Sequence, residues 1–384
     1  MGVSDLLAGK RVCVCGGSGG VGKTTTSAAI ALGMAAEGAK VAVVTIDPAR
    51  RLANALGLQE LENEPRRVEP ERLAGAAGAG GTFSGELWAM MLDPKRTFDE
   101  LIDRIAADPE RAAEIKRNRI YGELSTAVSG SQEFTAVAKL YELERDGDFD
   151  LLVLDTPPSR NALDFLDAPT RLTSFLEGRA LKAFIRPTGL GMRVLGRGAT
   201  PLLGALRRVT GVDLIGDLTT FFALLGDMTD DFSTRARGVQ RMLRAPTTAF
   251  VLVTSTQQAA IDEALWFRRT LTEGGLPFAG VIVNRVHHDI LGEGDPEDLM
   301  SALEAELPGE LAGRVAENFF DYHRLARRDA RNMARLRDEL GGQPLLLVPY
   351  LDDDVHDVEG LLRVHRYLFG TDAEHERLLA DVIA

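Results

Sequence analysis

The chain is poor in cysteine, and this scarcity excludes one class of fold. Only Cys13 and Cys15 occur among its 384 residues, and both lie on one short apolar run. Two cysteines so placed do not make a disulfide scaffold. Because free cysteine is usually buried, we expect both thiols to be core residues.

Long apolar runs and an excess of positive charge are also missing. No apolar run reaches about 18 residues, so we expect no transmembrane helix. The N-terminus MGVSDLLAGKRV becomes polar too early for a signal peptide. The formal net charge is −13, whereas duplex-binding proteins usually carry a basic excess. The sequence therefore predicts a cytoplasmic protein with no nucleic-acid partner.

Short apolar, β-branched runs are plentiful, and they predict strands. Most are continuous, which is typical of strands covered on both faces. Helical patterns separate them, so we expect an α/β fold with a doubly wound, mostly parallel sheet. The runs lie at residues 10–15, 40–47, 86–92, 150–156, 248–255, 279–285 and 344–350.

Two stretches interrupt this alternation. Residues 62–85 are rich in Gly, Ala, Pro and charge, and predict a flexible surface excursion. Residues 164–245 contain no strand candidate, and their apolar residues recur at helical spacing. We therefore predict one domain built from residues 1–163 and 246–384, with a helical insert between the two parts.

The segment GSGGVGKT matches the phosphate-loop pattern GxxxxGK[ST], and it lies between a predicted strand and a predicted helix. Glycines let backbone N–H groups turn toward phosphates, and the helix N-terminus favours negative charge. Lys23 is predicted to reach the β- and γ-phosphates, and Thr24 to bind Mg²⁺. This is the P-loop NTPase signature. The predicted nucleotide-binding residues of the loop are Gly17, Ser18, Gly19, Gly20, Val21, Gly22, Lys23, Thr24 and Thr25.

Two further predicted strands end in aspartate, at Asp47 and Asp155. Ligands bind at the carboxyl ends of parallel strands, so both carboxylates are expected beside the loop. Asp155 fits the aspartate that steadies Mg²⁺, and Asp47 is available to orient or deprotonate the attacking water. A helix cap or a turn is the alternative for each. Residues 156–160 are predicted to form a switch segment.

The order and spacing of several motifs resemble the family of the arsenite-pump ATPase and of the ATPase that guides tail-anchored membrane proteins, with actinobacterial anion-transporting ATPases the most similar. The resemblance covers nearly the whole chain. It is most specific at the phosphate loop and at DTPPSR. The motifs are GSGGVGKTTT, TIDPARRLANALG, ELWAMMLDPKRTFDEL, VLDTPPSRNALDFLDAPTRL, VIVNR and VPYLDDDVHDVEGL.

The resemblance implies ATPase activity, ATP and Mg²⁺, and two nucleotides at a dimer interface. By the same resemblance, Asp47 is the water-activating aspartate and Asp155 the switch aspartate. Asn284 reads the adenine, and Pro349 and Tyr350 flank it. An amide at a strand end suits an adenine edge, although a turn residue is the alternative for Asn284.

One departure from the family concerns charge. Relatives usually carry GKGGVGKT, whose first lysine reaches the phosphates of the other subunit, and this chain has Ser18 there. A neutral hydroxyl does not neutralise developing phosphate charge. Three explanations stay open. A paralogous partner subunit brings the lysine, another cation such as Arg50 or Arg160 replaces it, or the chain hydrolyses ATP poorly.

Other departures concern metals and metalloids. Arsenite needs thiolates, and the chain has only two cysteines, so we do not expect arsenite export. The zinc-binding Cys-x-x-Cys of some relatives is absent, so no zinc clamp is expected between subunits. Iron–sulfur reductases are set aside for the same lack of cysteine.

The helical insert is the predicted client-binding subdomain. It interleaves apolar residues with arginines, as stretches that meet a partner helix or an anionic membrane do. A plain core with solvated arginines is the alternative. We expect a homodimer or a heterodimer that handles a hydrophobic protein client or a membrane-associated partner, with peripheral attachment to the membrane left open. A positioning or partition ATPase and a non-hydrolysing subunit are the competing functions.

Overall fold

The computed structural model describes residues 2–47, 50–73, 83–119, 121–122, 131–157, 228–289, 296–370 and 374. The chain divides into two compact units. The sheet unit consists of residues Met1–Met90, Asp148–Arg160 and Ala245–Ala384, and the helical unit of Met91–Gly147 and Asn161–Arg244. Within the predicted insert over 164–245, residues 164–227 lie outside the described residues.

An eight-stranded sheet forms the centre of the sheet unit, with the order β3-β4-β2-β5-β1-β6-β7-β8. The pairings of β1 with β5 and β6, of β2 with β5, and of β7 with β6 and β8 are parallel. The mostly parallel α/β fold is therefore confirmed. The strands are β1 (Val12–Gly16), β2 (Lys40–Thr45), β3 (Arg66–Arg67), β4 (Glu86–Met91), β5 (Leu151–Asp155), β6 (Thr248–Ser255), β7 (Phe278–Val286) and β8 (Leu345–Pro349).

Every apolar run that predicts a strand contains one. The central strands β1 and β5 are buried along their whole length, which is why their sequences are continuous rather than alternating. Cys13 and Cys15 are both fully buried on β1. The short strand β3 has no counterpart in the prediction, because it consists of two exposed arginines paired antiparallel to β4.

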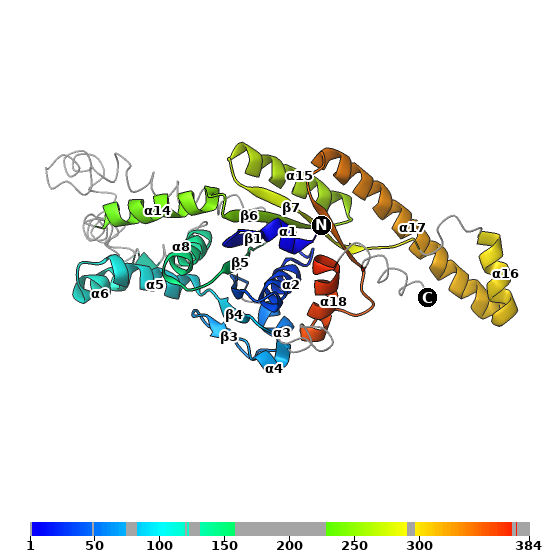
Figure 1. The fold of residues 1–384 in the computed structure, drawn as a ribbon, viewed down its shortest axis with the longest axis horizontal. Helices are drawn as coiled ribbons and strands as arrows, with labels where there is room; N and C mark the ends of the chain where they lie inside the picture. Colours follow the sequence, from blue (N-terminus) through cyan, green and yellow to red (C-terminus); the bar gives the residue numbers. More distant parts are fainter. Residues whose placement is uncertain are drawn as a thin grey trace, which may run out of the picture. The chain divides into compact units, whose positions relative to one another are not determined.

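Helices cover both faces of the sheet (Figure 1). The helices α2 and α18 lie on one face and pack against each other, whereas α15 lies on the other face, next to α17. The helices of this unit are α1 (Val3–Leu7), α2 (Lys23–Ala36), α3 (Arg51–Ala55), α4 (Pro70–Leu73), α15 (Gln258–Glu273), α16 (Pro296–Glu306), α17 (Gly309–Leu340) and α18 (Val358–Phe369).

The segment predicted as a flexible excursion, residues 62–85, contains β3 and α4. Val68 and Leu73 are buried in it, so apolar contacts hold this part of the segment in place. Residues 74–82 lie outside the described residues.

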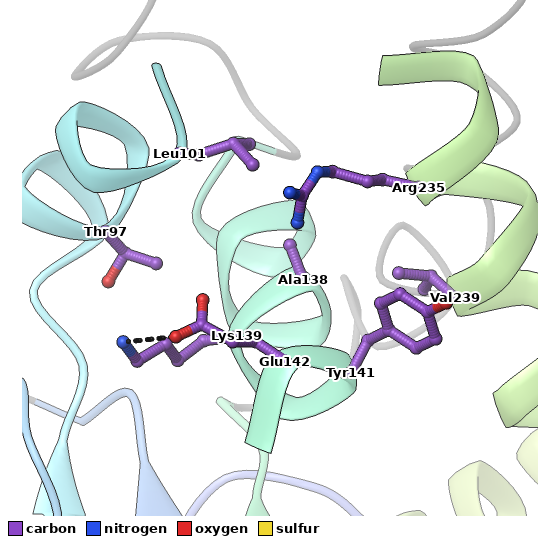
Figure 2. A pocket seen from close by; sticks show the side chains of 8 residues that line it. All are labelled: Thr97, Leu101, Ala138, Lys139, Tyr141, Glu142, Arg235 and Val239. Carbon is purple, nitrogen blue, oxygen red and sulfur yellow. Dashed lines mark hydrogen bonds and ion pairs between the residues drawn. The ribbon is translucent and has the colours of Figure 1, made fainter. Parts of the chain in front are cut away.

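The helical unit is described over α5 (Pro94–Ile105), α6 (Pro109–Arg117), α8 (Ser131–Asp146) and α14 (Thr229–Arg244). Helices α5 and α14 both pack against α8, and side chains from all three line a small pocket (Figure 2). Aspartates at residues 93 and 108 cap α5 and α6, each accepting a hydrogen bond from a backbone N–H of the first turn. Across the described ranges of the chain, we find no helix that is both long and apolar enough to span a membrane.

Candidate functional site

The loop between β1 and α2 holds the residues predicted to bind phosphate. Gly17 has a φ of 152°, and a Cβ atom there would lie 2.0 Å from the carbonyl oxygen of Val253. Gly22, which precedes α2, has a φ of 92°, and a Cβ atom there would lie 2.2 Å from Nδ2 of Asn284. Only glycine fits at both positions, so the loop backbone can lie directly against β6 and β7.

Val21 anchors this loop to the core. Its side chain clusters with Val253 and Ala260, whereas Gly19 and Gly20 are exposed. The loop therefore combines a fixed base with glycine backbone that faces solvent, which suits a backbone cradle for phosphate oxygens.

Lys23 is the first residue of α2, and its side chain lies over the loop. Its Nζ donates a hydrogen bond to the carbonyl oxygen of Ser18 at 2.7 Å. Burial lowers the pKa of the Lys23 ammonium, and the nearby Asp155 carboxylate counteracts that lowering. Thr24 and Thr25 follow on the first turn of α2 and are half-buried.

Asp155 ends β5, level with Cys15 on β1 and Thr45 on β2. Its Oδ2 accepts hydrogen bonds from Oγ1 of Thr24 at 2.7 Å and from Oγ1 of Thr45 at 2.9 Å. Its Oδ1 is buried and has no hydrogen-bond partner among the described residues. Burial raises the pKa of Asp155 to about 6, although the hydrogen bonds from the two threonines oppose the rise.

The oxygens of Thr24 and Asp155 fit a Mg²⁺ ion. Magnesium takes oxygen ligands and is usually held by one or two carboxylates together with substrate phosphates. The unpartnered Oδ1 of Asp155 offers such a ligand, and the Thr24 hydroxyl lies 2.7 Å from the other oxygen of the same carboxylate. A divalent cation would also offset the burial of this negative charge.

Asp47 lies just past the end of β2 and forms hydrogen bonds with Thr45 and Arg51. Its backbone N–H donates to Oγ1 of Thr45 at 3.2 Å, and its Oδ2 accepts from Nη1 of Arg51 at 3.1 Å. Arg50 instead forms an ion pair with Glu60 at 2.9 Å. Asp47 thus reaches Asp155 through the shared Thr45 hydroxyl.

The predicted switch segment begins with a contact to β1. Thr156 Oγ1 donates to the carbonyl oxygen of Cys15 at 2.7 Å, which fixes the first residue after Asp155. Pro48 and residues 158–160, the Arg160 candidate among them, lie outside the described residues.

Asn284 contacts the phosphate loop from β7. Its Nδ2 donates to the carbonyl oxygen of Val21 at 3.0 Å. On β7 it is level with Ser255 of β6, which places the amide at the carboxyl end of the sheet. One N–H of the amide thus supports the loop, and the adenine-reading role stays a prediction.

Pro349 and Tyr350 lie where β8 ends, two strands away from β6. Pro349 is level with Val286 of β7. Tyr350 is 51% exposed, and its ring stacks on His287 with 5.0 Å between ring centroids. His287 Nδ1 lies 2.7 Å from Oδ2 of the buried Asp329. The His287 contact was not predicted, because Asp329 lies on the distant helix α17.

Thr45 and Arg51 are two further site residues that the sequence reasoning missed. Thr45 carried a signal, because it is a hydroxyl residue at the end of an apolar strand, two positions before Asp47. Arg51 carried none, because only the fold shows which of two adjacent arginines faces Asp47.

Comparison with known proteins gives a family match over most of the chain. A family model for anion-transporting ATPases matches residues 10–323, a range that includes the loop, both aspartates and Asn284 but ends before Pro349. An arsenical pump-driving ATPase of Aquifex aeolicus is 24% identical over 366 residues, 94% of this chain and 79% of that protein. The ATPase get3 of Schizosaccharomyces pombe is 25% identical over 71% of this chain and 72% of its own length. The ATPase GET3 of Malassezia globosa is 31% identical over 42% of this chain and 43% of its own.

Proposed function

Because the chain belongs to the anion-transporting ATPase family, we propose that it is a Mg²⁺-dependent ATPase that acts as a nucleotide-driven dimeric switch. Its dimer is formed with a second copy or with a paralogous ATPase. In this proposal it handles a hydrophobic protein client or a membrane-associated partner rather than arsenite.

The Asp155 carboxylate carries the proposal. It lies between β1 and β2, binds the hydroxyl of the loop residue Thr24, and keeps one buried oxygen without a partner among the described residues. A bound Mg²⁺ would be held by Thr24 and Asp155, directly or through water, and would neutralise phosphate charge.

The remaining residues supply positioning and charge. Lys23 would exchange its hydrogen bond with the Ser18 carbonyl for one with the β- or γ-phosphate, and so stabilise the charge of the transition state. Asp47 would orient the water for in-line attack on the γ-phosphate and accept its proton. Asn284, Pro349 and Tyr350 would surround the adenine.

The cysteines support a client other than arsenite. The arsenic(III) of arsenite is a soft centre that favours thiolate ligands, and both thiols of the chain are fully buried on β1. A hydrogen bond with Cys15 and burial raise the pKa of the Cys13 thiol, which opposes thiolate formation. The protein client itself rests on the family resemblance and on the basic, apolar sequence of the insert.

The test is ATP binding and turnover by the full chain with and without Mg²⁺, beside Lys23→Ala. Lys23→Ala should lower turnover by about 10²–10³-fold, and omission of Mg²⁺ should abolish it. Turnover that survives the loss of Lys23 would place hydrolysis elsewhere.

The client class is tested in the same assay. We expect arsenite to leave turnover unchanged and a hydrophobic helical peptide to alter it. The matched control is the double variant Cys13→Ala, Cys15→Ala, which should respond to both additions as the wild type does. Stimulation by arsenite that the double variant loses would contradict the proposal.

A weakly hydrolysing subunit of a heteromeric complex is the second candidate, and Ser18 favours it. The Ser18 side chain is uncharged, and its buried Oγ has no hydrogen-bond partner among the described residues. This candidate predicts tight ATP binding with turnover only after a lysine-bearing partner is added. Stimulation by liposomes or DNA would instead indicate a positioning or partition ATPase.

A further inference from the structure

Two adjacent arginines at the start of α3 form ion pairs with different carboxylates. Arg50, with a left-handed φ of 56°, pairs with Glu60 at 2.9 Å, and both side chains are well exposed. Arg51 is the first residue of α3, and its Nη1 lies 3.1 Å from Oδ2 of Asp47. The Arg50 guanidinium is thus held by Glu60, whereas the Arg51 guanidinium lies against Asp47, just past the end of β2.

A short series of contacts links Arg51 to the predicted magnesium ligands. The backbone N–H of Asp47 donates a hydrogen bond to Oγ1 of Thr45 at 3.2 Å. Oδ2 of Asp155 accepts hydrogen bonds from Oγ1 of Thr45 at 2.9 Å and from Oγ1 of Thr24 at 2.7 Å. Arg51 is also among the charges that act on Lys23, whose pKa burial lowers and the Arg51 guanidinium lowers further. Two cations therefore share the space around the loop.

The Arg51 side chain is free to change partner at little cost in packing. It is 67% exposed, whereas the carboxylate it contacts is 24% exposed. Exposed ion pairs contribute little stability, and a guanidinium binds phosphate oxygens bidentately. A triphosphate is therefore a stronger partner for Arg51 than the single Asp47 carboxylate.

We propose, on the basis of the ATPase function above, that Arg51 supplies from the same chain the positive charge that Ser18 lacks. Arg51 binds the γ-phosphate of ATP and gives up its ion pair with Asp47 as it does so. Asp47 then orients water only when a γ-phosphate is in place. ADP, which has no γ-phosphate, leaves the Asp47–Arg51 pair intact.

The test is calorimetric titration of the full chain with ATP and with ADP, in the presence of Mg²⁺, together with steady-state turnover. The variants are Arg51→Ala, Arg51→Lys and the matched control Arg50→Ala. Arg51→Ala should lower ATP affinity at least about tenfold and leave ADP affinity unchanged, while turnover falls. Arg51→Lys should lie between wild type and Arg51→Ala, and Arg50→Ala should match wild type.

Three outcomes would overturn the assignment of Arg51. They are equal losses of ATP and ADP affinity in Arg51→Ala, no change in either affinity, and faster turnover, which would make the ion pair only a brake on Asp47. Circular dichroism checks folding, and Arg51→Lys decides the matter if Arg51→Ala does not fold. Lys23→Ala separates the two proposals. If it loses ATP binding while Arg51→Ala retains it, only the Arg51 proposal fails; if the wild type binds no ATP, both fail.

Discussion

Asp155 in the sheet unit and Lys139 in the helical unit are both buried charged residues, 1% and 5% exposed, yet their surroundings differ. Asp155 has one oxygen bound by two threonines and the other without a partner among the described residues. Lys139 Nζ contacts the carboxylates of Glu100 on α5 and Glu142 on α8, each at 3.2 Å. The contact with Glu142 is drawn in Figure 2.

The difference separates a ligand site from a structural one. Two carboxylates compensate the charge of Lys139, and Arg104 in turn pairs with Glu142 at 2.5 Å, so this network stabilises the packing of α5 on α8. Among the described residues, Asp155 accepts hydrogen bonds from two hydroxyls and has Lys23 as its nearby opposite charge, yet its burial still raises its pKa to about 6. A buried charge that its neighbours compensate only in part costs stability unless a ligand completes the compensation. Incomplete compensation, rather than burial, therefore marks the candidate site.

The largest expected effect is on turnover. Asp47→Asn keeps the shape of the side chain but removes its charge, so turnover should fall by about 10²–10⁴-fold while ATP still binds. Steady-state hydrolysis and calorimetric titration measure the two quantities. Equal loss of binding and turnover would show that Asp47 is needed for the shape of the site instead.

Substitution of Lys139 should change the stability of the protein but not its ATP turnover. Lys139→Met keeps the aliphatic stem but leaves Glu100 and Glu142 without their shared cation, so the free energy of unfolding should fall by about 3 kcal/mol. Urea denaturation followed by circular dichroism measures it. ATP turnover should be unchanged, and a loss of turnover at full stability would show that the Lys139 network also serves catalysis.

Asp155→Asn should do the reverse, losing turnover while gaining about 3 kcal/mol of stability at neutral pH. In the wild type the native carboxyl has a pKa of about 6, above its unfolded value of 3.8, so the native state binds the proton more tightly and loses stability as pH rises between these values. The gain should be complete above about pH 6 and vanish below about pH 4. Unfolding curves recorded across this range test it, and a gain independent of pH would assign it to packing.

The smallest effect is expected at an exposed pair of the helical unit. Lys95 contacts Asp99 at 2.8 Å on the surface of α5, and such pairs contribute about 0.3–0.5 kcal/mol. Lys95→Ala should therefore lower the free energy of unfolding far less than Lys139→Met, in the same denaturation assay. Similar losses in both variants would show that burial does not set the strength of the Lys139 network.

The sequence predicts best what is encoded locally. The strands, the loop glycines and Asp155 follow from apolar runs and from one motif whose strand, loop and helix are continuous in the chain. The Asn284–Val21 contact joins residues 263 positions apart, and the Lys139–Glu100 pair joins two helices. Such contacts depend on strand order and helix packing, which no local pattern contains. The choice of Arg51 over its neighbour depends on which carboxylate each arginine meets in the fold, Asp47 for Arg51 and Glu60 for Arg50.

Whether this chain alone hydrolyses ATP is decided most directly by steady-state turnover with Mg²⁺ over a range of protein concentrations. With the positive charge supplied by Arg51, we predict a specific activity that rises with concentration to a plateau, as a dimer of identical chains forms, with no other protein added. Near-zero turnover at every concentration, with ATP still bound and activity restored only by a relative that carries GKGGVGKT, would contradict this.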